Sequence, residues 1–368
     1  MGRKPRFGED RDEIVFEVCY RLIEKRETAD TIVAALKEDR GVEISREQVY
    51  RLVREGIDQK FVRMSAPTRR ILAERLAHAC GVPEDRIQVV AARGLLANEH
   101  VAARGAEITL RLIKDLGKRK PTVHLALGAG WTTMRLARHL AQLVREDPPH
   151  PRLVLHALSS ALDPADPMRS PVAFFTFFQD MSRIDFVGLF SAAAVDVRNY
   201  ARDKRLPGVA EPFARRNEID IVVTSLGDPH HEDGSLNRFL RLSPARAAED
   251  LRKNHVVVGE VQCMPFSAQR PVTMRSGFRA VTLFEIPELA ARAQMQDKFL
   301  LLVAAPCGKC GELKTDALRP LLAEASLRIW THVVVDIAQA EILAATDLRE
   351  PEAVGPGRRP RAGGARTE

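Results

Sequence analysis

A short glycine-containing loop, Gly128-Ala129-Gly130, connects an apolar run to a segment with helical periodicity, and Thr132 and Thr133 follow it directly. Glycines let backbone amides approach an anion, threonine hydroxyls add donors, and the start of a helix supplies positive potential. The pattern therefore predicts a cradle for a phosphate group. The loop lacks the third glycine of a dinucleotide fingerprint and the Gly-Lys-Ser/Thr of a nucleotide P-loop. A tight strand-to-helix turn that binds nothing would use the same glycines, so both interpretations stay open.

Two further segments contain possible metal ligands or redox groups. Cys307-Gly-Lys-Cys310 has the spacing of a metal or redox pair, but a structural zinc site needs two more ligands and the sequence contains no second pair. We favour ordinary thiols, with an oxidation-sensitive or metal-binding pair as the alternative. The segment His230-His231-Glu232-Asp233 is interpreted as a solvated loop rather than a ligand cluster, because adjacent histidines point in different directions. No metal and no cofactor are predicted.

The amino-terminal region could contact DNA. A short helix starting near Thr28 or Asp30 precedes a well-capped helix at 45–55, and two such helices are the ingredients of a helix-turn-helix. Between positions 46 and 70 there are seven Lys/Arg against three Asp/Glu, a local excess expected of phosphate contact. The residues predicted to contact DNA are Ser45, Arg46, Gln48, Tyr50, Arg51 and Arg54. The connection at 37–44 is longer than usual, and a helical hairpin with a solvated charged face would look similar.

The composition limits the class of protein. The chain has 368 residues, a net charge of +7 and 45% hydrophobic residues, which is enough for two or three folded domains and excludes a wholly disordered chain. The longest apolar run, 299–305, is too short to cross a bilayer, and no apolar segment of a secretory signal follows the basic amino terminus. Five cysteines, an odd number, indicate reduced thiols. We expect a cytoplasmic protein.

The periodicity predicts three helices and a short strand (60–64) before residue 67, and then alternating strands and helices. Strands are predicted at 87–91, 122–127, 153–158, 186–190, 219–225, 256–258, 299–305 and 332–336. Helices are predicted at 98–116, 132–145, 244–254, 286–296 and 314–324. Such alternation predicts a mostly parallel sheet covered by helices on both faces. The predicted domains are 1–66 and 67–347, and the Gly-, Pro- and Arg-rich segment 348–368 is predicted to be a disordered tail.

The order and spacing of these segments, from about Arg11 to Ala345, resemble the SorC family of bacterial sugar-responsive transcriptional regulators, which is related to the DeoR group. Besides the amino-terminal helices and the glycine loop, the resemblance rests on Ile219-Asp-Ile-Val-Val-Thr-Ser-Leu-Gly227-Asp228, Asn254-His-Val-Val-Val-Gly259-Glu260-Val261, Leu301-Leu-Val-Ala-Ala305, Lys314-Thr-Asp-Ala-Leu-Arg-Pro-Leu-Leu322 and Val333-Val-Val-Asp336. It implies a helix-turn-helix (winged-helix-like) domain followed by an α/β domain similar to sugar-phosphate isomerases. It also implies a phosphorylated sugar effector, a double-stranded DNA operator and a homodimer or homotetramer.

The resemblance further implies which residues bind the effector. These are Gly128, Gly130, Thr132, Thr133, Gly227, Asp228, Glu260, Lys309 and Lys314. The sequence departs from the family pattern in Pro306-Cys-Gly-Lys-Cys-Gly311, so Lys309 rather than Lys314 is a candidate for the functional amine, and in Glu260, where aspartate is commoner. Two other functions compete with the regulator: an isomerase-like enzyme with Glu260 as its base, and an interaction module that has lost the ligand.

Overall fold

The computed structural model describes residues 10–59, 61–62, 65–147, 151–160, 166–229, 231, 234–241, 249, 256–272, 277–346 and 348. Contacts divide the chain into two compact units, Met1–Ser65 and Ala66–Glu368, and each unit has its own hydrophobic core. The division lies next to the change in sequence texture at residue 67. Apart from Leu348, the predicted tail 348–368 lies outside the described residues.

The amino-terminal unit contains three helices, α1 (Arg11–Ile23), α2 (Ala29–Arg40) and α3 (Arg46–Asp58). Helix α2 ends at Gly41, which adopts the left-handed conformation with φ of 65°, so the connection to α3 is only 41–45 and is shorter than predicted. Of the predicted strand 60–64, Phe61 and Val62 instead form a turn onto the Gly56 carbonyl, and positions 60, 63 and 64 lie outside the described residues.

Helices α1 and α3 pack closely against each other at Gly56. A Cβ atom on this residue would lie 2.3 Å from Cys19 Sγ and 3.3 Å from Val15 Cγ1, and Val15, Cys19 and Gly56 are all buried. Arg11 reinforces the contact through two bonds to the Glu55 carboxylate, at 2.7 and 2.8 Å. A glycine is therefore required at position 56 for packing.

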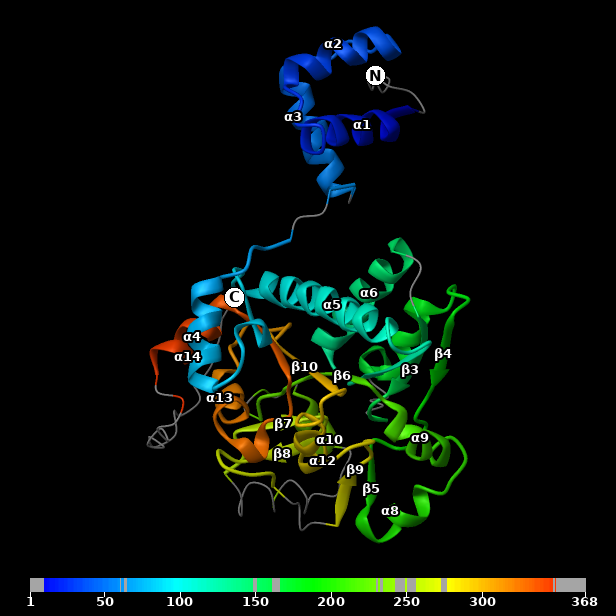
Figure 1. Cartoon of the computed structure of the whole chain (residues 1–368), viewed down its shortest axis with the longest axis vertical. Coiled ribbons are helices and arrows are strands. Elements are labelled where there is room, and N and C mark those ends of the chain that lie inside the picture. The colour runs from blue at the N-terminus through cyan, green and yellow to red at the C-terminus, as the bar shows by residue number, and fades with distance from the viewer. Residues whose placement is uncertain are drawn as a thin grey trace, which may run out of the picture. The chain divides into compact units, whose positions relative to one another are not determined.

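The larger unit is built on a seven-stranded sheet in which all neighbouring strands are parallel (Figure 1). The strand order is β1-β11-β10-β6-β2-β3-β4. The strands are β1 (Ile87–Val90), β2 (Thr122–Leu127), β3 (Arg152–Ala157), β4 (Ile184–Val187), β6 (Ile221–Ser225), β10 (Phe299–Ala304) and β11 (His332–Asp336). Every residue of β11 is buried, as expected for a strand covered on both faces. The predicted mixed α/β fold class is confirmed.

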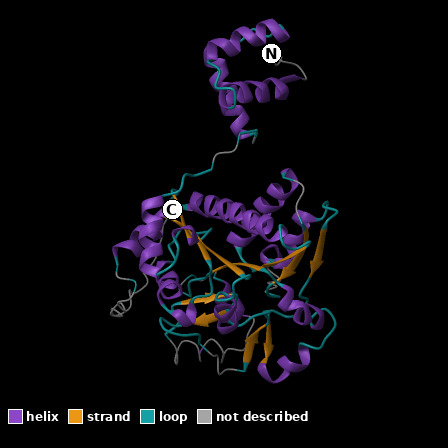
Figure 2. Ribbon diagram, viewed as in Figure 1, coloured by secondary structure: helices purple, strands orange, loops and turns teal. Residues whose placement is uncertain are grey.

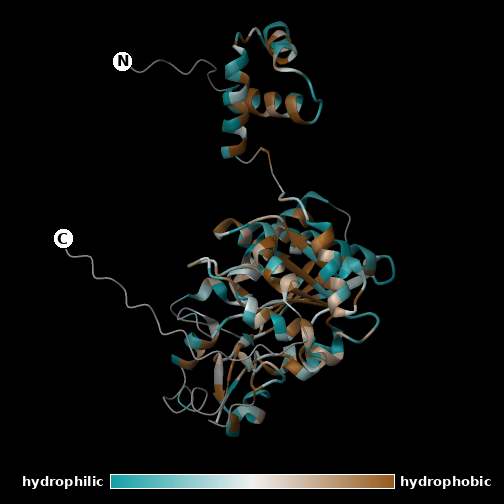
Figure 3. Cartoon of the chain, turned by 90° about the vertical axis from the view of Figure 1, so that its left-hand side faces the viewer, coloured by the Kyte–Doolittle hydropathy of each residue, from teal (hydrophilic) through white to brown (hydrophobic). Residues whose placement is uncertain are grey.

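Helices lie on both sides of this sheet (Figure 2), and the strands consist mainly of hydrophobic residues (Figure 3). Buried apolar residues of the strands and of the helices form one core cluster. The longer helices are α4 (Arg70–Cys80), α5 (Leu95–Gly117), α6 (Trp131–Glu146), α13 (Thr315–Ala323) and α14 (Ile337–Ala345). Shorter helices are α7 (Pro171–Phe174), α8 (Val197–Asp203), α9 (Ala210–Arg215), α10 (Ser235–Arg241) and α12 (Ile286–Arg292). Among the residues described, no helix combines the length and the apolar character needed to span a bilayer.

Two small antiparallel pairs supplement the sheet, and the sequence did not predict them. They are β5 (Ala194–Asp196) with β9 (Phe278–Ala280), and β7 (Gly259–Val261) with β8 (Met264–Phe266). The predicted strand 256–258 is wrong, because these residues form a loop and pairing begins only at Gly259. The predicted helix 244–254 lies outside the described residues, apart from Glu249.

We predict that Gly56→Ala destabilises the amino-terminal unit, because the new methyl group overlaps the Cys19 sulfur. The expected loss is about 1 to 3 kcal/mol of unfolding free energy, measured by denaturant unfolding monitored by far-ultraviolet circular dichroism. Cys19→Ala removes the overlapping atom, so the double variant should be more stable than Gly56→Ala alone. If Cys19→Ala brings no recovery, the assigned packing contact is wrong.

Candidate functional site

The predicted effector-binding residues lie after three neighbouring strands. Gly128 follows β2, Gly227 follows β6, and Lys314 follows β10, and these strands are adjacent in the order β10-β6-β2. Because the strands are parallel, their carboxyl ends lie at one edge of the sheet, where open α/β sheets bind ligands. The β7–β8 hairpin reaches the same edge, since Glu260 and Gly227 exchange backbone hydrogen bonds of 2.9 and 3.0 Å.

The amides of the glycine loop are occupied by protein acceptors. Gly128 N donates to the Val223 carbonyl at 2.8 Å, Ala129 N to Gln262 Oε1 at 2.8 Å, and Gly130 N to the Arg169 carbonyl at 3.1 Å. The amides of Thr132 and Thr133 open helix α6 and have no acceptor among the described residues, as the first amides of a helix have none within it. An anion at this edge would therefore contact the first turn of α6 rather than the loop.

The two threonine hydroxyls contact protein groups. Thr132 Oγ1 accepts a hydrogen bond from Asn98 Nδ2 at 3.2 Å, and Thr133 Oγ1 lies 3.5 Å from Ser225 Oγ. Both threonines are buried. Asn98 Nδ2 also donates to the Pro306 carbonyl at 2.9 Å and so links the start of α6 to the loop after β10. The threonine side chains hold the site together, whatever their role toward a ligand.

Two arginines that the sequence did not single out add positive charge at the start of α6. The guanidinium of Arg169 lies 4.9 Å from the Trp131 ring centre and that of Arg135 lies 5.7 Å from it. Arg169 also pairs with Asp166, at 2.5 Å, and Arg135 with Glu99, at 3.2 Å. The sequence could have indicated the contact between Trp131 and Arg135, because residues four positions apart on a helix lie on the same side. Among the described residues, the first turn of α6 thus combines two amides without an acceptor with two arginines, each of which is also paired with a carboxylate.

Gln262 shapes the glycine loop and was also missed. Its Oε1 accepts from Ala129 N at 2.8 Å and Ser159 Oγ at 2.7 Å, and its Nε2 donates to Thr224 Oγ1 at 3.0 Å and to the Ala129 carbonyl at 3.3 Å. A Cβ on Gly128 would lie 2.5 Å from Nε2, so glycine is needed there for close approach. Gln262 itself has a φ of 53°, which non-glycine residues rarely adopt.

Glu260 and Lys314 lie close to Gly227 and Asp228. Glu260 Oε2 accepts from Cys263 N at 2.7 Å, and a Cβ on Gly227 would lie 2.0 Å from the other carboxylate oxygen. Lys314 Nζ donates to the Leu226 carbonyl at 3.0 Å. Burial lowers the pKa of the Lys314 ammonium, and the charges of Cys307, Glu260 and Asp228 oppose this shift. Of the two candidate lysines, Lys314 therefore lies close to the other predicted residues, and Lys309 is exposed to solvent.

Residues of the loop after β10 lie next to His231 of the loop after β6, although the two loops are far apart in the sequence. The sulfur atoms of Cys307 and Cys310 and a ring nitrogen of His231 all lie within 4.8 Å of one another. Burial raises the pKa of the Cys307 thiol, but hydrogen bonds from the amides of Cys310 and Lys309 and the charge of Lys314 outweigh it, so this pKa is lowered. The interpretation as a solvated loop is wrong for His231, whose side chain is buried with a ring nitrogen within 4.8 Å of both sulfurs. His230, Glu232 and Asp233 lie outside the described residues.

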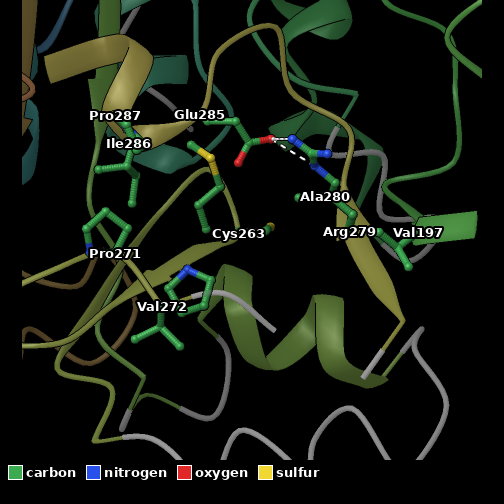
Figure 4. Close-up of a pocket in the computed structure, with 11 residues that line it drawn as sticks. Val197, Cys263, Pro271, Val272, Arg279, Ala280, Glu285, Ile286 and Pro287 are labelled. Atoms are coloured by element: carbon green, nitrogen blue, oxygen red, sulfur yellow. Dashed lines mark hydrogen bonds and ion pairs between the residues drawn. The ribbon is translucent and has the colours of Figure 1, made fainter. Parts of the chain in front are cut away.

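A separate cavity of about 360 Å³ adjoins the hairpin (Figure 4). Its wall is mostly apolar, with Met264, Val272 and Ile286 among the lining residues, and Cys263 also contributes to it. The one charged pair drawn there is Arg279 with Glu285, whose Nη2 and Oε1 atoms are 2.6 Å apart. The two turn residues of the hairpin therefore have different contacts. The Gln262 amide bonds to the glycine loop, and Cys263 lines this cavity.

The predicted DNA-contacting residues divide into two groups. Ser45 and Gln48 form a capping box, because Ser45 Oγ accepts from Gln48 N at 3.3 Å and Gln48 Oε1 accepts from Ser45 N at 2.8 Å. These two side chains therefore stabilise the start of α3. The other four, Arg46, Tyr50, Arg51 and Arg54, are exposed. Arg46, Tyr50 and Arg54 recur every four residues and lie along one side of α3.

We predict that Gln262→Ala destabilises the larger unit by about 1 to 3 kcal/mol, because the part-buried Ala129 amide loses its acceptor and the buried Thr224 hydroxyl loses a donor. Denaturant unfolding measures the loss. Gln269→Ala, at an exposed position, is the matched control and should change the unfolding free energy by less than about 0.5 kcal/mol. Equal effects of the two substitutions would contradict the assigned role of Gln262.

No protein-family profile and no curated protein sequence matches the chain significantly. Several solved structures are similar to it. The full-length sorbitol operon regulator SorC from Klebsiella pneumoniae is similar over 92% of this chain and 100% of its own, with 14% identity and a TM-score of 0.63. A DeoR family transcriptional regulator from Listeria monocytogenes is similar over 74% and 98%, with 17% identity and a TM-score of 0.53.

A third structure is a domain of a Vibrio fischeri transcriptional repressor that is described as sugar-binding. It is similar over 75% of this chain and 99% of its own, with 14% identity and a TM-score of 0.55. At these identities the likeness concerns the fold, and the mixed α/β architecture with amino-terminal helices is common to this chain and the SorC structure. The chain therefore has the fold of the SorC- and DeoR-type sugar-binding transcriptional regulators.

Proposed function

We propose that this chain is a DNA-binding transcriptional regulator whose operator binding is controlled by a phosphorylated sugar or a related small metabolite. The observation that carries the proposal is the first turn of α6 at the carboxyl edge of the sheet, where helix-start amides lie beside the Arg169 and Arg135 guanidiniums, in a chain that also presents an exposed arginine-bearing helix. No chemical step is required of such a protein, and we propose that it is not an enzyme and acts in the cytoplasm.

The DNA-binding half of the proposal rests on α3. Its inward residues Val49 and Leu52 are buried, and its start is fixed by the capping box. Arg46, Tyr50 and Arg54 form an exposed row, with Arg51 beside it, and such side chains can contact base edges or phosphates in a major groove. We therefore propose α3 as the recognition helix of a helix-turn-helix, in a homodimer or homotetramer that matches a symmetric operator.

The effector-binding half rests on charge and geometry at the sheet edge. A phosphate at the first turn of α6 would accept hydrogen bonds from the Thr132 and Thr133 amides and lie near the Arg169 and Arg135 guanidiniums. Lys314 and Asp228 would face the sugar hydroxyls. An effector that binds one arrangement of the subunits more tightly than another shifts DNA affinity by that difference.

The isomerase-like enzyme is the second candidate, because Glu260 and Lys314 lie together at this edge. The Glu260 carboxylate contacts the backbone of its own hairpin, where Oε2 accepts from Cys263 N at 2.7 Å. A general base must reach a substrate proton, and this orientation favours a structural role for the carboxylate. Binding without turnover is therefore the proposal that the geometry supports best.

For DNA binding, we predict that selection from a random duplex pool yields a preferred, two-fold related sequence. Arg51→Ala and Arg54→Ala should each weaken binding to it by about tenfold or more and reduce its salt dependence, because each removes a base or phosphate contact. Electrophoretic mobility shift at several salt concentrations provides the measurement. Lys25→Ala, also exposed in this unit but outside α3, is the matched control and should bind like the wild type. A pool that shows no sequence preference would refute the proposal.

For the effector, we predict that one or more sugar phosphates raise the unfolding temperature of the full chain and change its affinity for the selected DNA. Lys314→Met should weaken this ligand by about tenfold or more and leave DNA binding without ligand intact, because it removes a charged group from the site. The exposed Lys118→Met is the matched control. Stabilisation by none of the sugar phosphates would indicate an interaction module, and turnover that Glu260→Gln abolishes would indicate the enzyme.

A further inference from the structure

Three potential metal ligands converge between two loops of the larger unit. Cys307 and Cys310 belong to the loop after β10, and His231 belongs to the loop after β6. One ligand atom from each residue lies within 4.8 Å of the other two. Two thiolates and an imidazole form a set that favours Zn²⁺ over the harder Mg²⁺ and Ca²⁺. The sequence shows no second pair of ligands for the two cysteines. The fold supplies one further ligand, because it places His231 beside them.

The turn that holds the cysteines has a compact backbone. Cys307 N donates to the Glu312 carbonyl at 2.8 Å, and Gly311 N donates to the Cys307 carbonyl at 2.9 Å. Gly311 adopts a φ of 76°, which a glycine accepts without strain. The amides of Lys309 and Cys310 are directed at the Cys307 sulfur. The turn therefore presents both sulfurs on one side before any ion binds.

Glu312 provides a candidate for the fourth ligand. Its Oε2 lies 2.7 Å from His231 Nε2 and 3.6 Å from Cys310 Sγ. The Glu312 side chain is 66% exposed and the Cys310 side chain is exposed, so an ion can enter from solvent. A redox pair of cysteines needs neither a histidine nor a carboxylate beside its sulfurs, whereas a tetrahedral zinc ion needs four ligands. The cluster of His231, Cys307 and Cys310, with Glu312 bonded to two of its three members, favours a metal.

We propose that His231, Cys307, Cys310 and Glu312 bind one Zn²⁺ ion. The two thiols bind as thiolates, and the displaced protons pass to solvent. The ion fastens the loop after β6 to the loop after β10. Because Gly308 in the cysteine turn packs on Asn98 and Arg135, whose side-chain nitrogens would lie 3.6 and 3.4 Å from a Cβ there, the ion would also brace the start of α6. Zinc binding itself does not depend on the proposed effector.

A second cluster of potential ligands, His124, His156 and Glu218, lies elsewhere in the larger unit and is less suited to a cation. His124 Nδ1 and His156 Nε2 are 3.0 Å apart and already form a hydrogen bond. Burial, together with the charges of His124 and Arg215, lowers the pKa of His156 to about 3, so its imidazole stays neutral and serves as a hydrogen-bond partner of His124. This cluster is accounted for by packing and hydrogen bonding.

The proposal is tested on the full chain, purified under reducing conditions without a metal-affinity step. Elemental analysis should find about one zinc per chain, and Co²⁺ added to the metal-free protein should give the intense d–d and thiolate-to-cobalt charge-transfer absorption of a tetrahedral thiolate site. Cys307→Ser, Cys310→Ser and His231→Asn should abolish stoichiometric binding, and Glu312→Gln should weaken it by about tenfold or more. Circular dichroism checks that each variant is folded.

Cys80→Ala and His78→Asn are the matched controls, since neither residue belongs to the cluster, and both variants should retain one zinc. The cobalt spectrum of the wild type tests the proposal even if a ligand variant fails to fold. Absence of both zinc and the cobalt absorption in reduced protein would overturn it, as would unchanged binding in the ligand variants. If the reduced protein binds no metal and oxidation of it by air forms a Cys307–Cys310 disulfide, the pair belongs to redox chemistry instead.

Discussion

The side-chain amide of Gln262 is the interaction on which the candidate site depends. One amide group bonds to both backbone groups of Ala129, to Ser159 and to Thr224, which belong to the loops and strand ends of three neighbouring strands. Buried polar groups must be satisfied, and here a single side chain satisfies several at once. These hydrogen bonds hold the β7–β8 hairpin against the edge of the sheet and stabilise the conformation of the glycine loop.

The parallel sheet is the second constraint, because it brings the ends of β10, β6 and β2 to one edge. Residues nearly two hundred positions apart in sequence, such as Thr132 and Lys314, therefore contribute to one region. Asn98 connects the start of α6 to the loop after β10, and Lys314 connects that loop to the end of β6. A ligand or an ion held at this edge would be close to several of these loops at once.

The amino-terminal unit shows how stability limits which side chains can recognise a partner. The capping box uses Ser45 and Gln48 to satisfy the first amides of α3, so these side chains serve the helix itself. The close approach at Gly56 and the Arg11–Glu55 pair fix the inner side of the same helix. The exposed row of Arg46, Tyr50 and Arg54, with Arg51 beside it, remains available for the proposed contact with DNA.

The sequence by itself determined the elements that follow from local periodicity: the three amino-terminal helices, the capped start of α3 and the main strands of the sheet, with β2 and β11 predicted to the residue. It also located Gly128, Gly227 and Lys314 after strands, because apolar runs and glycines are local signals. Only the tertiary structure decided that Gln262 fills the glycine loop, that Arg169 lies over Trp131, and that His231 meets Cys307 and Cys310. These contacts join segments that are far apart in the chain. Periodicity is a local property of the sequence, so it cannot predict which distant loops become neighbours; the order of strands in the sheet decides that.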